Sequence, residues 1–232
     1  MNIYFLVEGQ SSEAELYPAW LSHLVPELTR VDNFDEVHHN NYYLFSSYGI
    51  PFIENDIINA IEDINSSGLY RYFVICIDAD SATVNQREAK IIRLMQEKQI
   101  ALSDNTLLKI IVQNQCIETW FLGNRRVYSR NPQNNPRFIE YSRFYNVSQN
   151  DPELMGKLQN FDGSISKFHF AYLKAMFNER GNMRYSKSNS LEVQRITYLN
   201  ELVQRISDEE AHLQTLNNFL EFCRRIRMEI GS

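Results

Sequence analysis

The sequence lacks the short signatures of the commonest metal and nucleotide sites. Its three cysteines, Cys76, Cys116 and Cys223, are far apart, which excludes a CxxC motif and favours reduced, buried thiols. The five histidines have no HExxH or related spacing, so we expect no zinc site. Neither GxxxxGKS, GxxxxGKT nor GxGxxG occurs, so the chain offers no recognisable loop for the phosphates of ATP.

Long apolar runs are missing as well. No stretch approaches the roughly 18 consecutive apolar residues of a membrane-spanning helix. The N-terminus has no basic and apolar signal pattern, so we expect a cytoplasmic protein without membrane contact. With 232 residues, of which 44% are hydrophobic, the chain is long enough to bury one substantial core.

Charge is distributed unevenly along the chain. Residues 1–123 contain 7 Lys and Arg against 17 Asp and Glu, a net charge of −10, whereas residues 124–232 contain 16 against 12, a net charge of +4. An acidic half that holds metal and a basic half that meets phosphates would suit a metal-dependent enzyme acting on nucleic acid. Drift in surface charge would give the same asymmetry, and the sequence leaves both interpretations open.

The hydrophobic pattern alternates between strands and helices. This alternation predicts an α/β fold, with a mostly parallel sheet flanked by helices. The helix after the first strand is expected to open with a capping box of Ser12 and Glu15. Strands are predicted over residues 2–7, 42–45, 72–77 and 107–112, and helices over residues 12–24, 53–64, 88–99 and 116–122. The apolar runs 2–7 and 72–77 are expected to be buried strands of the sheet. The sequence Ser66-Ser67-Gly68 is expected to end the helix of residues 53–64.

The second half has a different character. Residues 124–151 are rich in Asn, Pro and Arg and predict a long loop. Helices are predicted beyond it, over 165–178, 191–205 and 207–227, forming a C-terminal helical extension. We expect a catalytic core over residues 1–123, with the loop and extension of residues 124–232 packed on it as one unit.

The last predicted helix carries two further expectations. It should open with a capping box of Ser207 and Glu210. Its apolar stripe from Leu213 to Cys223 would either dock a partner or be buried within this chain, and burial is the commoner outcome.

Carboxylates follow two of the predicted strands. Glu8 comes directly after residues 2–7, and Asp78 and Asp80 come after residues 72–77. Ligands of parallel sheets bind beyond the carboxyl ends of strands, and hard cations prefer oxygen ligands. Glu8, Asp78 and Asp80 therefore predict a Mg²⁺ or Mn²⁺ site, in which period-two alternation would point both aspartates to the same side. Asp78 and Asp80 would alternatively cap the helix that follows them.

Two more acids are candidates for this site. Glu118, at the start of the helix predicted over 116–122, is a candidate ligand of a second metal site, and Glu13 is a candidate for the outer coordination sphere. In the simpler interpretation, Glu118 is either a solvated acid or one that complements the positive end of its helix, and Glu13 is an ordinary acid of the first helical turn.

The acidic segments resemble a known family. The sequence VEGQSSE of Val7–Glu13 resembles the EGxTE opening of Toprim-like proteins, and Asp78-Ala79-Asp80 looks like their DxD motif. The sequence IETWFL of Ile117–Leu122 is similar to the IExW segment of short stand-alone Toprim-like proteins, which are related to the nuclease part of the OLD family. The resemblance covers residues 1–123 and, weakly, residues 185–187. Gln10-Ser11-Ser12 replaces the usual threonine-containing turn.

This resemblance implies an activity. Toprim nucleases are endonucleases that use Mg²⁺ or Mn²⁺ to hydrolyse phosphodiester bonds of DNA or RNA, and Glu8, Asp78 and Asp80 occupy the matching positions. It also implies an ABC- or AAA-type ATPase partner, because such short proteins are often encoded beside one in bacterial anti-phage systems. The alternative is a non-catalytic Toprim-like subunit that contributes binding surface to an ATPase complex.

Arginines alternate with aromatic residues in the predicted loop. Arginine for phosphates and aromatic rings for stacked bases is a pattern of single-strand or RNA contact. Alternatively, the loop is an ordinary one that its aromatic residues anchor to the protein. For Arg184 and Lys187, which follow Gly181, the alternative is exposed charge on a turn. The candidate phosphate-binding residues are Arg125, Arg126, Arg130, Arg184 and Lys187.

Overall fold

The computed structural model describes residues 1–49, 51–181 and 183–231, which fall into two compact units. Unit 1 comprises Met1–Ile77, Val84–Val112 and Asn218–Ser232, and unit 2 comprises Asp78–Thr83 and Gln113–Asn217. The helical extension expected after residue 123 is thus divided, because its last helix contributes mainly to unit 1.

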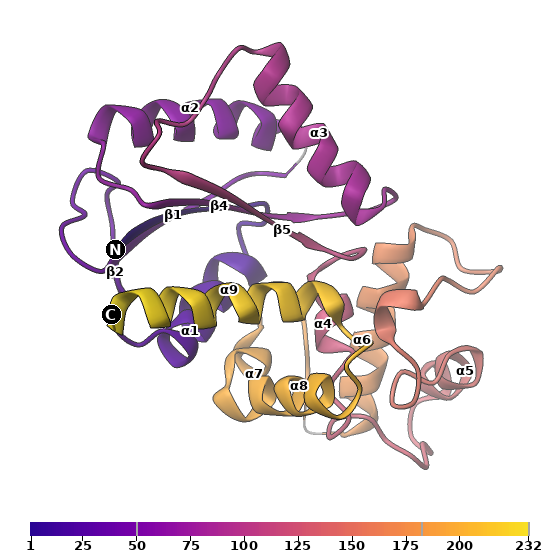
Figure 1. Cartoon of the computed structure of the whole chain (residues 1–232). Coiled ribbons are helices and arrows are strands. Elements are labelled where there is room, and N and C mark those ends of the chain that lie inside the picture. Colours follow the sequence, from indigo (N-terminus) through magenta and orange to yellow (C-terminus); the bar gives the residue numbers. More distant parts are fainter. Residues whose placement is uncertain (50, 182, 232) are drawn as a thin grey trace. The chain divides into compact units, whose positions relative to one another are not determined.

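A five-stranded parallel sheet is the centre of unit 1, with the strand order β2-β3-β1-β4-β5 (Figure 1). This confirms the predicted α/β class. In the central strand β1 every residue is buried, and in β4 every residue but the last, as their continuous apolar sequences predicted. In the parallel pairing of β1 with β4, Val7 lies opposite Cys76. The strands are β1 Asn2–Val7, β2 Thr29–Val31, β3 Asn41–Ser46, β4 Tyr72–Asp78 and β5 Leu107–Gln113.

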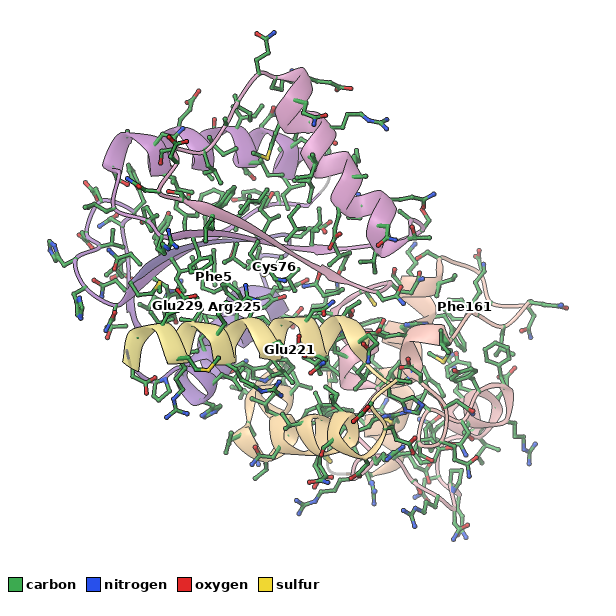
Figure 2. The ribbon with its side chains drawn as sticks, viewed as in Figure 1. Phe5, Cys76, Phe161, Glu221, Arg225 and Glu229 are labelled. Atoms are coloured by element: carbon green, nitrogen blue, oxygen red, sulfur yellow. The ribbon has the colours of Figure 1, made fainter. Side chains whose placement is uncertain are left out.

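Helices cover both faces of this sheet. The helices α1 Ser12–Leu24 and α9 Gln214–Gly231 lie on one face, and α2 Phe52–Ser67 and α3 Val84–Glu97 lie on the other (Figure 1). Phe219 of α9 packs edge-on against Tyr17 of α1, with ring centroids 5.4 Å apart. Figure 2 shows Phe5 and Cys76 on the face of the sheet that α9 covers. The apolar stripe predicted from Leu213 to Cys223 is buried within the chain.

Local signals placed some helix ends correctly and others wrongly. Gly68, in the left-handed region at φ 63°, ends α2 as predicted. The capping box predicted for Ser12 and Glu15 is wrong, because Ser11 precedes α1 without a side-chain cap and Ser12 Oγ bonds the Glu13 carboxylate instead, at 3.0 Å.

Unit 2 is helical. The segment predicted as a loop contains α5, whose start is capped by the Asn135 side chain, with Pro136 at the first helical position. The predicted helix 191–205 is interrupted at Arg195. The helices of unit 2 are α4 Ile117–Phe121, α5 Pro136–Phe144, the 3₁₀ turn η1 Pro152–Leu154, α6 Ile165–Glu179, α7 Leu191–Gln194 and α8 Ile196–Asp208.

The start of α9 differs from the prediction. Ser207 lies inside α8, so it forms no capping box with Glu210. The backbone N–H groups of Leu213 and Thr215 instead donate to the carboxylates of Asp151 and Glu153, respectively. The N-terminal end of α9 is therefore capped by acids some 60 residues earlier in the chain.

Aromatic residues form much of the core of unit 2. Phe138 and Tyr141 of α5 are buried against Tyr172 and Phe168 of α6, and the Tyr141–Phe168 ring centroids are 5.0 Å apart. Phe138 and Tyr141 therefore anchor their segment to the core of unit 2. Such anchoring was the alternative to the prediction that the aromatic rings stack on bases. None of the described helices combines the length and apolar character that crossing a bilayer requires.

Candidate functional site

Glu8 lies at the carboxyl end of the central strand of unit 1. Its N–H donates to the carbonyl of Cys76 in β4 (3.1 Å), and its own carbonyl accepts the N–H of Gly49 (3.1 Å). Gly49 adopts φ +81°, a left-handed conformation that favours glycine. Two neighbouring strands and one tight turn thus hold the backbone of this half-buried glutamate.

Glu13 folds back onto the turn that follows Glu8. It is only 5% exposed, and Ser12 Oγ donates to its carboxylate. A Cβ built at Gly9 would lie 2.1 Å from Glu13 Oε2 and 2.6 Å from Oε1. Gly9 is therefore needed for close approach of the carboxylate. The predicted place of Glu13 in an outer coordination sphere stays a prediction.

The two aspartates lie at the start of unit 2 and differ in backbone conformation. Asp78 is the last residue of β4, whereas Asp80 has φ +52°, in the left-handed region. The extended alternation that would point both side chains to one side therefore ends at Asp78. The Asp80 N–H donates to Gln115 O at 2.9 Å, and Ser166 Oγ donates to Asp80 Oδ1 at 3.4 Å, which fixes this turn against the start of α6.

Glu118 is a buried acid of unit 2. It is 1% exposed, and the hydroxyl of Tyr185 donates to its Oε1 at 3.1 Å, so the interpretation of Glu118 as a solvated acid is wrong. Burial raises the pKa of the neighbouring Cys116 thiol, and the charges of Glu118 and Asp78 raise it further. Asp78 and Glu118 are thus close enough to Cys116 for their charges to disfavour its thiolate.

The predicted metal ligands belong to both units. Glu8 lies in unit 1, and Asp78, Asp80 and Glu118 lie in unit 2. Within residues 1–49, 51–181 and 183–231, no three His, Cys, Asp or Glu side chains are grouped so as to hold a metal ion. The donor chemistry nevertheless fits the predicted cofactor, because carboxylate oxygens are the ligands that Mg²⁺ and Mn²⁺ prefer.

The predicted phosphate-binding residues have different environments. Arg125 is held by contacts within the protein, because its Nε donates to Ser148 O at 3.0 Å and its Nη2 forms a salt bridge with Glu209 at 3.2 Å. Arg126 is more open, with its side chain 73% exposed and 4.0 Å from Glu201. Exposed positions are also occupied by Arg130, Arg184 and Lys187.

The chain was compared with protein-family models, curated proteins and solved structures. No protein-family model, no curated protein and no solved structure matches this chain. The resemblance to Toprim-like proteins accordingly rests on the residues of the sequence.

Sequence reasoning missed two features near the predicted site. One is Tyr185, whose hydroxyl donates a hydrogen bond to Glu118, 67 residues earlier in the sequence. No local sequence pattern predicts this pairing. The other is an exposed aromatic pair beside Gly49, formed by Tyr48 (74% exposed) and Phe52 (56% exposed). Their position next to a glycine turn after a strand was the available signal, since loops at strand ends carry function.

Proposed function

We propose that this chain is a Mg²⁺- or Mn²⁺-dependent Toprim-like endonuclease that hydrolyses phosphodiester bonds of DNA or RNA in the cytoplasm. One observation carries the proposal: Glu8 follows β1 and Asp78 ends β4, and these strands are parallel neighbours. Both acids therefore belong to the carboxyl edge of a parallel sheet, the edge at which such sheets bind ligands.

The residues of the chain would have distinct tasks in this reaction. Glu8, Asp78 and Asp80 would hold the metal, with Glu118 as a further ligand. A bound divalent ion would lower the pKa of the attacking water and stabilise the leaving oxygen. Asp80 is suited to its task because Ser166 and Gln115 fix its turn before any ligand arrives.

The proposal includes two partners. Nucleic acid is favoured by the positive charge of the second half of the sequence, with Arg126, Arg130 and Arg184 exposed. An ABC- or AAA-type ATPase is implied by the resemblance, which would make this chain the effector of an anti-phage system. The sequence supports a separate ATPase because it has no phosphate-binding loop of its own.

The decisive experiment is a cleavage assay on plasmid, single-stranded DNA and tRNA with Mg²⁺ or Mn²⁺. Glu8→Gln and Asp78→Asn keep side-chain size but remove the charge that binds metal. We expect both variants to lose about 100-fold or more of the wild-type rate, because metal-dependent hydrolysis depends on these ligands. Asp104→Asn is the matched control, since Asp104 is exposed in the segment before β5 and should not affect the rate.

Two results would count against the proposal. Undiminished cutting by Glu8→Gln and Asp78→Asn, with circular dichroism showing folded protein, would remove these acids from catalysis. No cutting by the wild type, together with no Mg²⁺ or Mn²⁺ binding by calorimetry, would leave the non-catalytic subunit of an ATPase complex as the better hypothesis.

A further inference from the structure

Unit 2 contains a hollow of about 550 Å³ whose charged lining residues are all cationic. Its lining comes from the last turns of α6, from Gly181 and from residues 183–189. No Asp or Glu is among the described residues of the lining. The polar side chains that line it are Lys174, Asn178, Arg184, Tyr185, Ser186 and Asn189.

The wall of this hollow is packed against the core of unit 2. Tyr185 is only 3% exposed, and its ring packs against Phe121 and Phe177, with centroids 5.8 Å and 5.9 Å away. Ser186 and Asn189 exchange both of their backbone N–H···O bonds, at 3.2 Å and 2.9 Å. A ligand would therefore find the polar groups of this wall already in place, which lowers the entropy cost of binding.

The two cations are available to a ligand. Lys174 and Arg184 are exposed, and within the part of the chain that the structure describes neither forms an ion pair. Lys174 Nζ instead lies 5.3 Å from the ring centroid of Phe170. By contrast, Arg125 of the same unit is neutralised by Glu209. Neither cation of the hollow is therefore held in a salt bridge within the described residues, although Glu192 lines an adjoining hollow that shares Arg184, and two unbridged cations favour an anion.

We propose that this hollow binds phosphate groups of a nucleic acid strand, with Lys174 and Arg184 as charged donors and Asn178, Ser186 and Asn189 as neutral hydrogen-bonding groups. Its volume lies within the range of about 300–1,000 Å³ that is usual for ligand pockets. The hydroxyl of Tyr185, which lies in the same wall, binds Glu118. The inference rests on the proposed function for the identity of the strand as substrate.

The test measures binding in the absence of metal. A fluorescent single strand of about 12 nucleotides is titrated in EDTA and followed by anisotropy. Lys174→Gln and Arg184→Gln should each weaken binding about tenfold, because a hydrogen bond to a charged group is worth roughly 1.5–3 kcal/mol. Each should also reduce the slope of log K against log salt by about 0.7, the value for one lost phosphate contact on a single strand.

Matched variants make the result specific. Lys98→Gln removes one exposed positive charge from unit 1 and should leave both affinity and slope unchanged. Lys174→Arg keeps the charge and should retain most of the binding. Losses in Lys174→Gln and Arg184→Gln no larger than in Lys98→Gln would overturn the proposal, as would a wild type that binds no strand.

The binding and cleavage measurements together separate this inference from the proposed function. Strand binding that depends on Lys174 and Arg184, in a wild type that cuts nothing with Mg²⁺ or Mn²⁺, supports the pocket and refutes the nuclease. Metal-dependent cutting with unimpaired binding by both variants does the reverse. A mononucleotide such as dTMP that binds as tightly as the strand, and loses affinity in the same variants, would overturn the assignment to a strand.

Discussion

The carboxylate of Glu13 lies directly against the backbone of Gly9, so that a Cβ at position 9 would fall 2.1 Å from Glu13 Oε2. Gly9 and Glu13 are four residues apart in the sequence. Their contact closes the turn that joins β1 to α1, immediately after Glu8. Any larger residue at position 9 must displace a carboxylate that is almost fully buried. The glycine of the acidic motif is therefore explained by packing on Glu13.

This contact predicts the effect of Gly9→Ala. The methyl group should expel the Glu13 side chain and lower the free energy of unfolding by about 1–3 kcal/mol, the usual cost of overpacking. Urea denaturation measures the change. Gly9→Ala combined with Glu13→Ala should recover part of the loss. Gly156→Ala is the control, because nothing lies within 4 Å of a Cβ at that position. Equal effects of the two glycine substitutions would contradict the prediction.

His169 predicts a loss of stability in acid. Burial lowers its pKa to about 4, while its Nε2–H donates to Met155 O and its Nδ1 accepts from the Thr119 hydroxyl. Because the folded pKa lies below the unfolded value of 6.5, its stabilising contribution is present above pH 6.5 and is lost as the pH falls toward 4. The total is on the order of 3 kcal/mol.

The measurement is urea unfolding at several pH values between 7 and 4. His169→Gln cannot take up a proton, so its stability should fall less over this range than that of the wild type. His23→Gln, which changes an exposed histidine in the last turn of α1, is the control. Parallel pH curves for wild type and His169→Gln would refute the role of this histidine.

Glu153 predicts the opposite dependence. Burial raises its pKa to about 7, although the backbone N–H and hydroxyl of Thr215 donate to it. Because the folded pKa lies above the unfolded value of 4.5, its contribution is complete below pH 4.5 and is lost as the pH rises through 7.

Glu153→Gln should flatten this loss between pH 5 and pH 8. The fluorescence of Trp120 offers a local readout, because Trp120 Nε1–H donates to the Thr215 hydroxyl at 2.7 Å. Wild-type emission should shift with pH in this range, and that of Glu153→Gln should not. A shift that persists unchanged in the variant would assign it to another group.

Arg205 is the buried cation of α8, and its loss should be costly. It is 1% exposed and donates to the carbonyls of Gly123 (3.0 Å), Val147 (2.7 Å) and Asn150 (2.8 Å). Arg205→Lys cannot reach three carbonyls, so we expect a loss of about 3 kcal/mol or more in the free energy of unfolding, because buried acceptors stay unpaired. Arg93→Lys, at an exposed position of α3, should change stability by less than about 0.5 kcal/mol. Equal stabilities of the two variants would contradict this role.

The elements that the sequence predicted well are those whose signals are local. The apolar runs of β1 and β4 and the glycine at the end of α2 needed no distant partner to be recognised. Strand β2 was missed because Thr29–Val31 is short and largely exposed, without alternation. Helix α5 was missed because Asn and Pro suggested a loop, although Asn135-Pro136 is itself a helix-start signal.

The candidate site shows the same division. The acids at the strand ends could be located from the sequence, since strand boundaries are local. The burial of Glu118 could not, because it depends on Tyr185 from a distant segment. The left-handed turn at Asp80 also escaped prediction, since its N–H is held by Gln115 beyond the end of another strand.

The division of the chain between units sets an order of events during synthesis. Unit 1 needs residues from 218 onward, so every residue of unit 2 leaves the ribosome before unit 1 has all its contacts. Until then Tyr17, Trp20 and Tyr72 lack the rings of Phe219 and Phe222 that cover them in the finished fold. The aromatic side chains of α1 and β4 that α9 covers thus stay exposed for the whole time that unit 2 is being made, and exposed apolar surface of this kind favours aggregation of a nascent chain.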